Sequence, residues 1–250
     1  MTWQRVRWLA PIVLAAALGS TSLAWAVKPR AGSLSWTAPG GSSGSVSWNI
    51  VILLTLLTLL PSLLLAMTPF ARLLVVFHFL RQALGTQATP SNQTLIGLAL
   101  ILTFFFMQPV GEAIYETAIV PYERGQVDAM QAIERGAAPL RKFMLKYARE
   151  KDLALFVELS KEPRPARPED LGMRIVAPAY ILSELKAGFQ IGAALYLPFL
   201  AVDMVVAAIT TSVGMLQLPP VVISTPLKIL LFVMVDGWNV LVGSLMKSFS

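Results

Sequence analysis

Four long apolar segments constrain the fold of this chain more than any other feature. They cover 48–68, 95–111, 175–214 and 221–250, and about 20 apolar residues in a helix cross a hydrocarbon core of roughly 30 Å. Only 14% of the residues are charged and 56% are hydrophobic, whereas soluble domains carry about 25% charged residues. The sequence therefore predicts an all-α membrane protein built of long helical hairpins, kinked at prolines such as Pro61 and Pro198.

The composition also excludes several kinds of chemistry. The chain has no cysteine, and His78 is its only histidine, so disulfides, thiolate metal sites, cysteine nucleophiles and two-histidine metal sites cannot form. We expect no metal, no cofactor and no catalytic residue. The net charge is +6, but basic and acidic residues alternate without forming a basic stripe, so nucleic acid is not expected as a partner.

The first 47 residues have the composition of a targeting segment and a linker. Arg5 and Arg7 precede an apolar stretch, and an Ala24-Trp25-Ala26 pattern follows, which predicts a cleaved signal peptide over 1–26. An uncleaved anchor helix is the alternative. Residues 27–47 are rich in Gly, Ser and Pro and are expected to form a flexible periplasmic lead-in.

Two polar stretches separate the apolar segments. Residues 69–94 are interpreted as a connection, in which Arg72 and Arg81 are the only fixed charges. Residues 112–174 contain 11 basic and 11 acidic residues with apolar positions at helical spacing, which predicts a polar helical insert. Signal cleavage places the insert outside and the short, acid-free connection inside, in agreement with the positive-inside rule for short loops.

The last two apolar regions carry charges at positions expected to be buried. At 40 residues, region 175–214 is too long for one plain span, and 215–220 has the Gly/Pro flanks of a sharp turn before region 221–250. Residues equally far from the apex of an antiparallel hairpin lie at the same depth, so Asp203 and Lys228, centred between Met215 and Leu216, are predicted to pair. The five charges assigned to assembly or register are Glu184, Lys186, Asp203, Lys228 and Asp236.

Two further spacings concern packing. Gly188 and Gly192 stand at i, i+4, which lets another helix approach closely. Glu184 and Lys186 stand at i, i+2 and cannot face each other on a helix. At least one of them therefore needs a partner elsewhere, which favours assembly with other subunits.

Three functional classes fit buried charges in apolar helices. The pairs can be structural, or they can belong to an ion-coupled secondary transporter, which would predict a repeat between the two halves that the sequence lacks. An intramembrane hydrolase would need a nucleophile and a base in apposed segments, and His78 is interpreted as lying on a loop far from the hairpin. A pore-forming structural subunit is preferred.

Seven short motifs occur along the chain after residue 80. They are 81–85 (RQALG), 89–93 (TPSNQ), 178–186 (PAYILSELK), 188–192 (GFQIG), 196–200 (YLPFL) with Asp203, 226–228 (PLK) and 236–239 (DGWN). Together they make the chain resemble the FliP family of flagellar type III export-gate proteins, whose injectisome counterpart is SctR. Pro90–Gln93 and the predicted signal favour the flagellar branch.

This resemblance implies an assembly and a function that the composition does not. It implies a ring of five copies joined by FliQ and FliR in a helical pore, with FlhA and FlhB nearby, in the flagellar basal body at the inner membrane and its periplasmic face. Unfolded flagellar proteins pass through such a pore, so the chain would be required for flagellum assembly. Much of the apparently transmembrane sequence would lie outside the bilayer.

The resemblance also assigns a role to the turn. The family carries a methionine-rich loop that closes around the pore, and Met215, Leu216 and Gln217 occupy that position here. They are the expected gate or pore constriction. The turn departs from the family pattern because it contains a single methionine.

Overall fold

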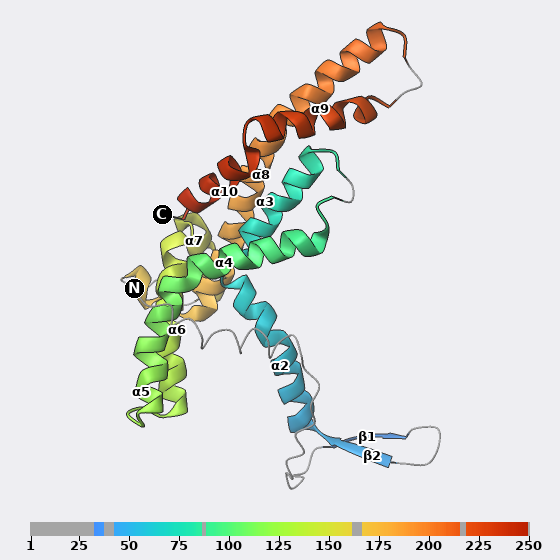
Figure 1. Ribbon diagram of the computed structural model, residues 1–250. Coiled ribbons are helices and arrows are strands. Elements are labelled where there is room, and N and C mark those ends of the chain that lie inside the picture. Colours follow the sequence, from blue (N-terminus) through green and yellow to red (C-terminus); the bar gives the residue numbers. More distant parts are fainter. Residues whose placement is uncertain (1–32, 38–42, 87–88, 162–166, 216–218, 250) are drawn as a thin grey trace. The chain divides into compact units, whose positions relative to one another are not determined.

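The computed structural model describes residues 33–37, 43–86, 89–161, 167–215 and 219–249. Its contacts divide the chain into two units, Met1–Leu57 and Thr58–Ser250, and each is described by itself. The predicted signal peptide lies outside the described residues. The all-α fold class is confirmed, with one small hairpin of strands in addition (Figure 1).

The first unit contains the strands and the beginning of a helix. Strands β1 (Ser33–Thr37) and β2 (Ser43–Ser47) pair antiparallel, with Ser33 opposite Ser47 and Thr37 opposite Ser43. Trp36 and Val46 favour strands, and residues 38–42 contain Pro and Gly. The lead-in therefore carries regular structure that its Gly/Ser/Pro content did not predict. Helix α2 (Trp48–Ala66) follows, with Leu53, Leu57 and Leu64 among its exposed apolar side chains.

The expected connection over 69–94 contains a helix. Helix α3 runs over Phe70–Ala83, and its Leu73, Val76, Phe77 and Leu80 are at most 1% exposed. These positions follow the i, i+3, i+4, i+7 pattern of a packed helix face. The loop interpretation was wrong, and His78 lies on α3 rather than on a loop.

The second apolar segment continues well past residue 111. Helix α4 (Asn92–Ile114) is capped by Ser91, whose side chain accepts a hydrogen bond from the Thr94 backbone amide at 3.2 Å. It runs without a break into the π-helical turn η2 (Tyr115–Ile119) and the short helix α5 (Val120–Glu123). The wide turn comes just before Pro121, which has no amide hydrogen to donate to a helix.

The polar insert is helical, as predicted. Helix α6 (Ala129–Tyr147) begins with a capping box between Asp128 and Gln131, and α7 (Glu150–Ser160) follows. The short 3-10 helix η3 (Pro168–Asp170) precedes the next long helix. Met144 and Leu153 pack with the start of that helix, at Ile175, Val176 and Tyr180.

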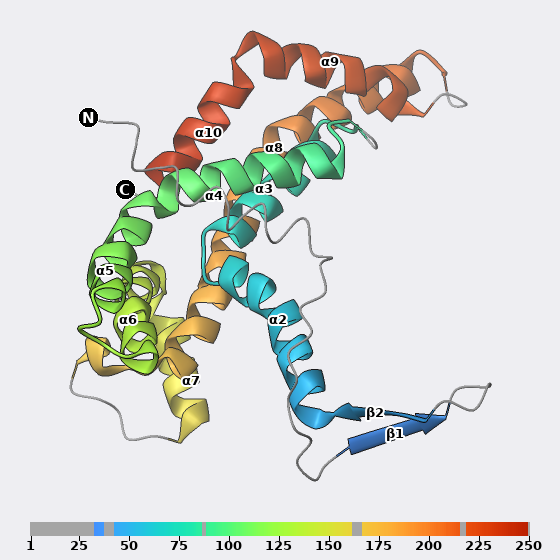
Figure 2. The ribbon, with the colours of Figure 1, turned by 60° about the horizontal axis from the view of Figure 1, so that its bottom comes forward.

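The C-terminal regions form one very long helix and a bent pair. Helix α8 (Met173–Ser212) has 40 residues and stays continuous through Pro178 and Pro198. At 1.5 Å per residue it is about 60 Å long, roughly twice a hydrocarbon core. Helix α9 (Pro220–Met234) turns by 65° into α10 (Gly237–Lys247). Figure 2 shows α10 leading from α9 toward α4, and Leu241 and Leu245 join the core that α3 and α4 share.

Among the described residues, two helical stretches are long and apolar enough to cross a membrane, Asn92–Glu123 and Met173–Ser212. Two bent pairs, Ile50–Ala66 with Phe70–Ala83 and Pro220–Met234 with Gly237–Lys247, reach the same length and composition when each is counted as one span. The helices thus match the apolar segments of the sequence and are compatible with membrane insertion.

Candidate gate hairpin and its charged supports

Helices α8 and α9 form the hairpin that the sequence predicts (Figure 1), and a charged pair joins its two arms. Lys228 Nζ on α9 lies 2.5 Å from Asp203 Oδ2 on α8. The Ser224 hydroxyl, one turn before Lys228, donates to the other carboxylate oxygen, Asp203 Oδ1, at 2.6 Å. The pairing deduced from the position of the apex is confirmed, and Ser224 is a third member that the sequence did not reveal.

Burial makes this pair asymmetric. The Lys228 side chain is 3% exposed, whereas that of Asp203 is 26% exposed. An ammonium group in apolar surroundings is strongly destabilised unless an anion compensates it. Removal of Asp203 should therefore destabilise the chain more than removal of Lys228.

The tip of the hairpin is the predicted constriction. Helix α8 ends at Ser212. Gly214 follows two residues later with a φ of +79°, which favours glycine, and Met215 has 43% of its surface exposed. Pro220 opens α9, where its missing amide hydrogen is not needed. Leu216 and Gln217 lie outside the described residues, so Met215 is the described member of the expected gate.

The arms next to the tip expose many apolar side chains. Val205 and Ile209 on α8 and Val213 at its C-cap follow at i, i+4 and i+8, lie on one side of the helix, and are 58%, 58% and 70% exposed. On α9, the side chains of Val222, Leu230, Val233 and Met234 are also largely exposed. An apolar surface of this kind is covered either by lipid or by other protein.

A second charged cluster lies where α3 packs on α8. Arg72 Nη2 donates to Glu184 Oε1 at 2.5 Å, and the two side chains are 7% and 0% exposed. Arg72 Nη1 reaches the Ser248 hydroxyl at 3.1 Å, and its guanidinium carbon lies 3.9 Å from the Phe249 ring centroid. The Tyr147 hydroxyl donates to the carbonyl oxygen of Phe249.

A third cluster ties the polar insert to α8. Lys186 Nζ pairs with Asp152 Oδ1 on α7, and the Ser183 hydroxyl donates to Asp152 Oδ2 at 2.8 Å. Burial raises the pKa of Asp152, but the hydrogen bonds from Lys186 and Ser183 outweigh it, so the pKa lies below its ordinary value of 3.8. Arg149 on the same insert donates a hydrogen bond from Nη2 to Gln190 Oε1 at 2.6 Å.

These clusters correct two expectations. Glu184 and Lys186 do not face each other, as predicted, but both find partners within the same chain, so their charges do not require another subunit. Asp236 is exposed rather than buried; it takes a left-handed conformation with φ of +51° at the bend before α10 and accepts a hydrogen bond from Asn239 at 3.2 Å.

The two glycines of α8 pack against α3 of the same chain. A Cβ at Gly188 would lie 3.1 Å from Val75, and one at Gly192 would lie 2.5 to 2.9 Å from carbons of Phe79. At Gly192 a side chain would not fit unless Phe79 moved, and at Gly188 the contact would be tight. Helix packing, the interpretation given to the spacing, is therefore observed within one chain.

The sequence interpretation missed Arg72, Asp152 and Ser224 as partners of the selected charges. Arg72 could have been found, because Leu73, Val76 and Leu80 predict a packed helix that would bury a neighbouring arginine. Ser224 lies one turn from Lys228 and could also have been found. Nothing local marks Asp152, which is one of 11 acidic residues in the insert.

Among the described residues, no group of three or more His, Cys, Asp and Glu side chains could hold a metal ion.

Known proteins resemble the chain over most of its length. The FliP family model matches residues 53–245, a range that holds both candidate spans and all three charged clusters except Ser248 and Phe249.

Three of the relatives that carry the name flagellar biosynthetic protein FliP show the extent of the similarity. That of Pectobacterium carotovorum subsp. carotovorum is 50% identical over 84% of this chain and 81% of its own length. That of Cereibacter sphaeroides is 49% identical over 84% of this chain and 70% of its own length. That of Bacillus subtilis strain 168 is 46% identical over 80% of this chain and 91% of its own length. The chain therefore belongs to the FliP family, whose named members serve flagellar biosynthesis.

Proposed function

We propose that this chain is a pore-forming core subunit of the flagellar type III protein export gate, which passes unfolded flagellar proteins across the inner membrane. One observation carries the proposal beyond family membership: a long helical hairpin, held in register by Asp203 and Lys228, carries a methionine at its tip and leaves both arms apolar and uncovered. In this role the tip lines the constriction and the arms pack against neighbouring subunits.

The length of α8 supports an assembly that rises from the bilayer. A helix of 40 residues is about 60 Å long and exceeds a hydrocarbon core by roughly 30 Å. Its apolar surface beyond the bilayer needs protein to cover it. A ring of five copies completed by FliQ and FliR, with FlhA and FlhB nearby, at the periplasmic face of the inner membrane in the basal body, would supply that cover.

The charged clusters support a structural role rather than ion transport. Arg72, Lys186 and Lys228 each have a carboxylate partner within the chain, and each pair joins two different helices. Pairs that join helices fix their register. We propose that all three clusters shape the subunit, and that translocation needs no catalytic residue in it.

A deletion strain tests the proposed export function. Loss of the gene should abolish both flagella and the secretion of filament subunits, while growth stays normal. A plasmid copy of the unchanged gene should restore both. Filaments of normal number and length in the deletion strain would refute the proposal.

The gate assignment has a separate test at the tip. Replacing Met215 and Leu216 with Gly should increase ion leakage through the idle complex, because two apolar side chains that exclude water are removed. Met130→Gly is a control, since Met130 is 72% exposed and lies on α6, outside the hairpin. Unchanged leakage in the tip variant, or equal leakage in the control, would refute the assignment.

A further inference from the structure

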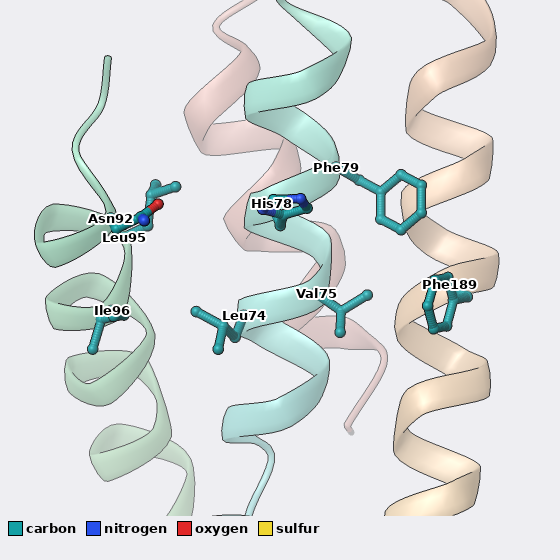
Figure 3. Close-up of a pocket in the computed structure, with 8 residues that line it drawn as sticks. All are labelled: Leu74, Val75, His78, Phe79, Asn92, Leu95, Ile96 and Phe189. Atoms are coloured by element: carbon teal, nitrogen blue, oxygen red, sulfur yellow. The ribbon is translucent and has the colours of Figure 1, made fainter. Parts of the chain in front are cut away.

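An apolar groove with one polar end runs along the surface of α3, between α4 and α8 (Figure 3). Its volume is about 410 Å³, within the range of roughly 300 to 1,000 Å³ that small-molecule sites occupy. Leu74 and Ile96 are among its aliphatic side chains, and Phe189 stands on the α8 side. His78 and Asn92 supply the polar groups at one end.

A guanidinium group without an acidic partner lies at that polar end. Arg81 donates to Asn92 Oδ1, and its Nη2 lies 3.5 Å from His78 Nδ1. Neither of these partners is an acidic side chain. The salt bridges formed by Arg72, Lys186 and Lys228 do not include Arg81.

The surrounding sequence offers no counterion. Between residues 48 and 111, Arg72 and Arg81 are the only charged residues, and Arg72 is neutralised by Glu184. Arg81 is half-buried, but both of its hydrogen bonds are exposed, so an anion from outside the protein can reach its charge. The groove therefore combines an apolar trough with a positive charge that attracts an anion.

We propose that this groove binds an anionic phospholipid, with one acyl chain along α3 and the headgroup phosphate at Arg81. The aliphatic and aromatic lining suits a hydrocarbon chain, whose transfer from water is favourable in proportion to the apolar area buried. The guanidinium group presents parallel donors that match two phosphate oxygens. His78 and Asn92 add polar contacts at the same end.

Charge favours this lipid over the other possible occupants. A zwitterionic lipid would bring its own cation and leave the charge of Arg81 only partly compensated. A free phosphate ion would leave the apolar trough empty. A helix from another protein would need a carboxylate at this depth, and it is treated as a competing outcome of the test.

The experiment measures lipid binding by native mass spectrometry. The full chain, purified in detergent in whatever assembly it forms, is titrated with phosphatidylglycerol or phosphatidylcholine of the same acyl chains. Phosphatidylglycerol should occupy one tight site per chain, phosphatidylcholine should bind at least about tenfold more weakly, and excess inorganic phosphate should not displace the lipid. A tenfold difference is the size expected when one charge-assisted hydrogen bond is lost.

Three variants separate the proposal from its rivals. Arg81→Gln should weaken phosphatidylglycerol binding at least about tenfold, and Ile96→Trp should do so by filling the trough, even if Arg81→Gln fails to fold. Arg135→Gln, a control at an exposed arginine on α6, should bind like the wild type. Circular dichroism checks the fold of each variant.

Several results would overturn the proposal. Equal binding of the two lipids would remove the role of charge, and an equal loss in Arg135→Gln would show non-specific attraction to basic surface. Unchanged binding in a folded Ile96→Trp would place the lipid elsewhere. Crosslinking of position 96 to another protein chain, with no lipid retained, would assign the groove to a protein interface.

Discussion

The unequal burial of Asp203 and Lys228 predicts that substitutions of the two residues have unequal costs in stability. Replacing Asp203 with Asn keeps the shape of the side chain and the bond from Ser224, but it leaves Lys228, which is 3% exposed, without an anion. Replacing Lys228 with Met leaves Asp203, which is 26% exposed, bonded to Ser224 and partly hydrated. The first change should therefore cost more than the second.

The magnitudes follow from burial. Removing one partner of a buried ion pair costs about 3 to 5 kcal/mol, and we expect this cost for Asp203→Asn. Losing a hydrogen bond to a charged group that water still reaches costs about 1.5 to 3 kcal/mol, which we expect for Lys228→Met. The double variant leaves neither charge, so it should be more stable than Asp203→Asn alone, with a coupling of about 0.5 to 3 kcal/mol.

The assay is unfolding of the purified chain in mixed micelles, followed by circular dichroism, for the wild type, both single variants and the double variant. Glu134→Gln, at an exposed glutamate on α6, controls for the loss of one charge. Reversing both charges, with Asp203→Lys and Lys228→Asp, should recover assembly that each single reversal loses. A larger cost for Lys228→Met than for Asp203→Asn, or additive single effects, would refute the reasoning.

Two further predictions concern packing and pH. Gly192→Ala should destabilise the chain by about 1 to 3 kcal/mol because its Cβ would overlap the Phe79 ring. The control Gly243→Ala adds a Cβ that meets nothing within 4 Å and should stabilise the chain by about 0.5 to 1 kcal/mol. Equal effects of the two variants on thermal unfolding would contradict this prediction. The pKa of Asp152 is lowered on folding from 3.8, so its contribution to stability is present above that pH and is lost as pH falls through the folded value. Asp152→Asn should therefore reduce the loss of stability in acid, measured by unfolding at pH 7 and below pH 4, and an unchanged acid dependence would contradict the assignment.

The hairpin could be predicted from the sequence because its geometry is local. A Gly/Pro turn defines the apex, and two opposite charges equally distant from it can meet in only one register. That reasoning uses residues 203–228 alone, and the structure places Asp203 and Lys228 in contact. The end of the long helix near Gly214 was predictable for the same reason.

Partners far apart in the sequence were not predictable. Glu184 meets Arg72 across 112 positions, and no turn or repeat relates them. Residues 69–94 were interpreted as a loop because they carry charges, although Leu73, Val76 and Leu80 have the spacing of a buried helix face. Asp152 was hidden among many exposed acidic residues, because only tertiary packing distinguishes a buried carboxylate from a solvated one.

The Arg72 cluster has a consequence for the order of events during synthesis. Arg72 contacts Glu184 and Ser248, and 176 positions separate Arg72 from Ser248. At about 5 to 20 residues per second, the ribosome needs roughly 10 to 35 s to cover that interval. During most of that time the arginine is outside the ribosome but cannot contact Ser248. The newly made chain must therefore keep this charge hydrated, at the membrane surface or against an insertion factor, until α8 and the last residues emerge and the core closes around it.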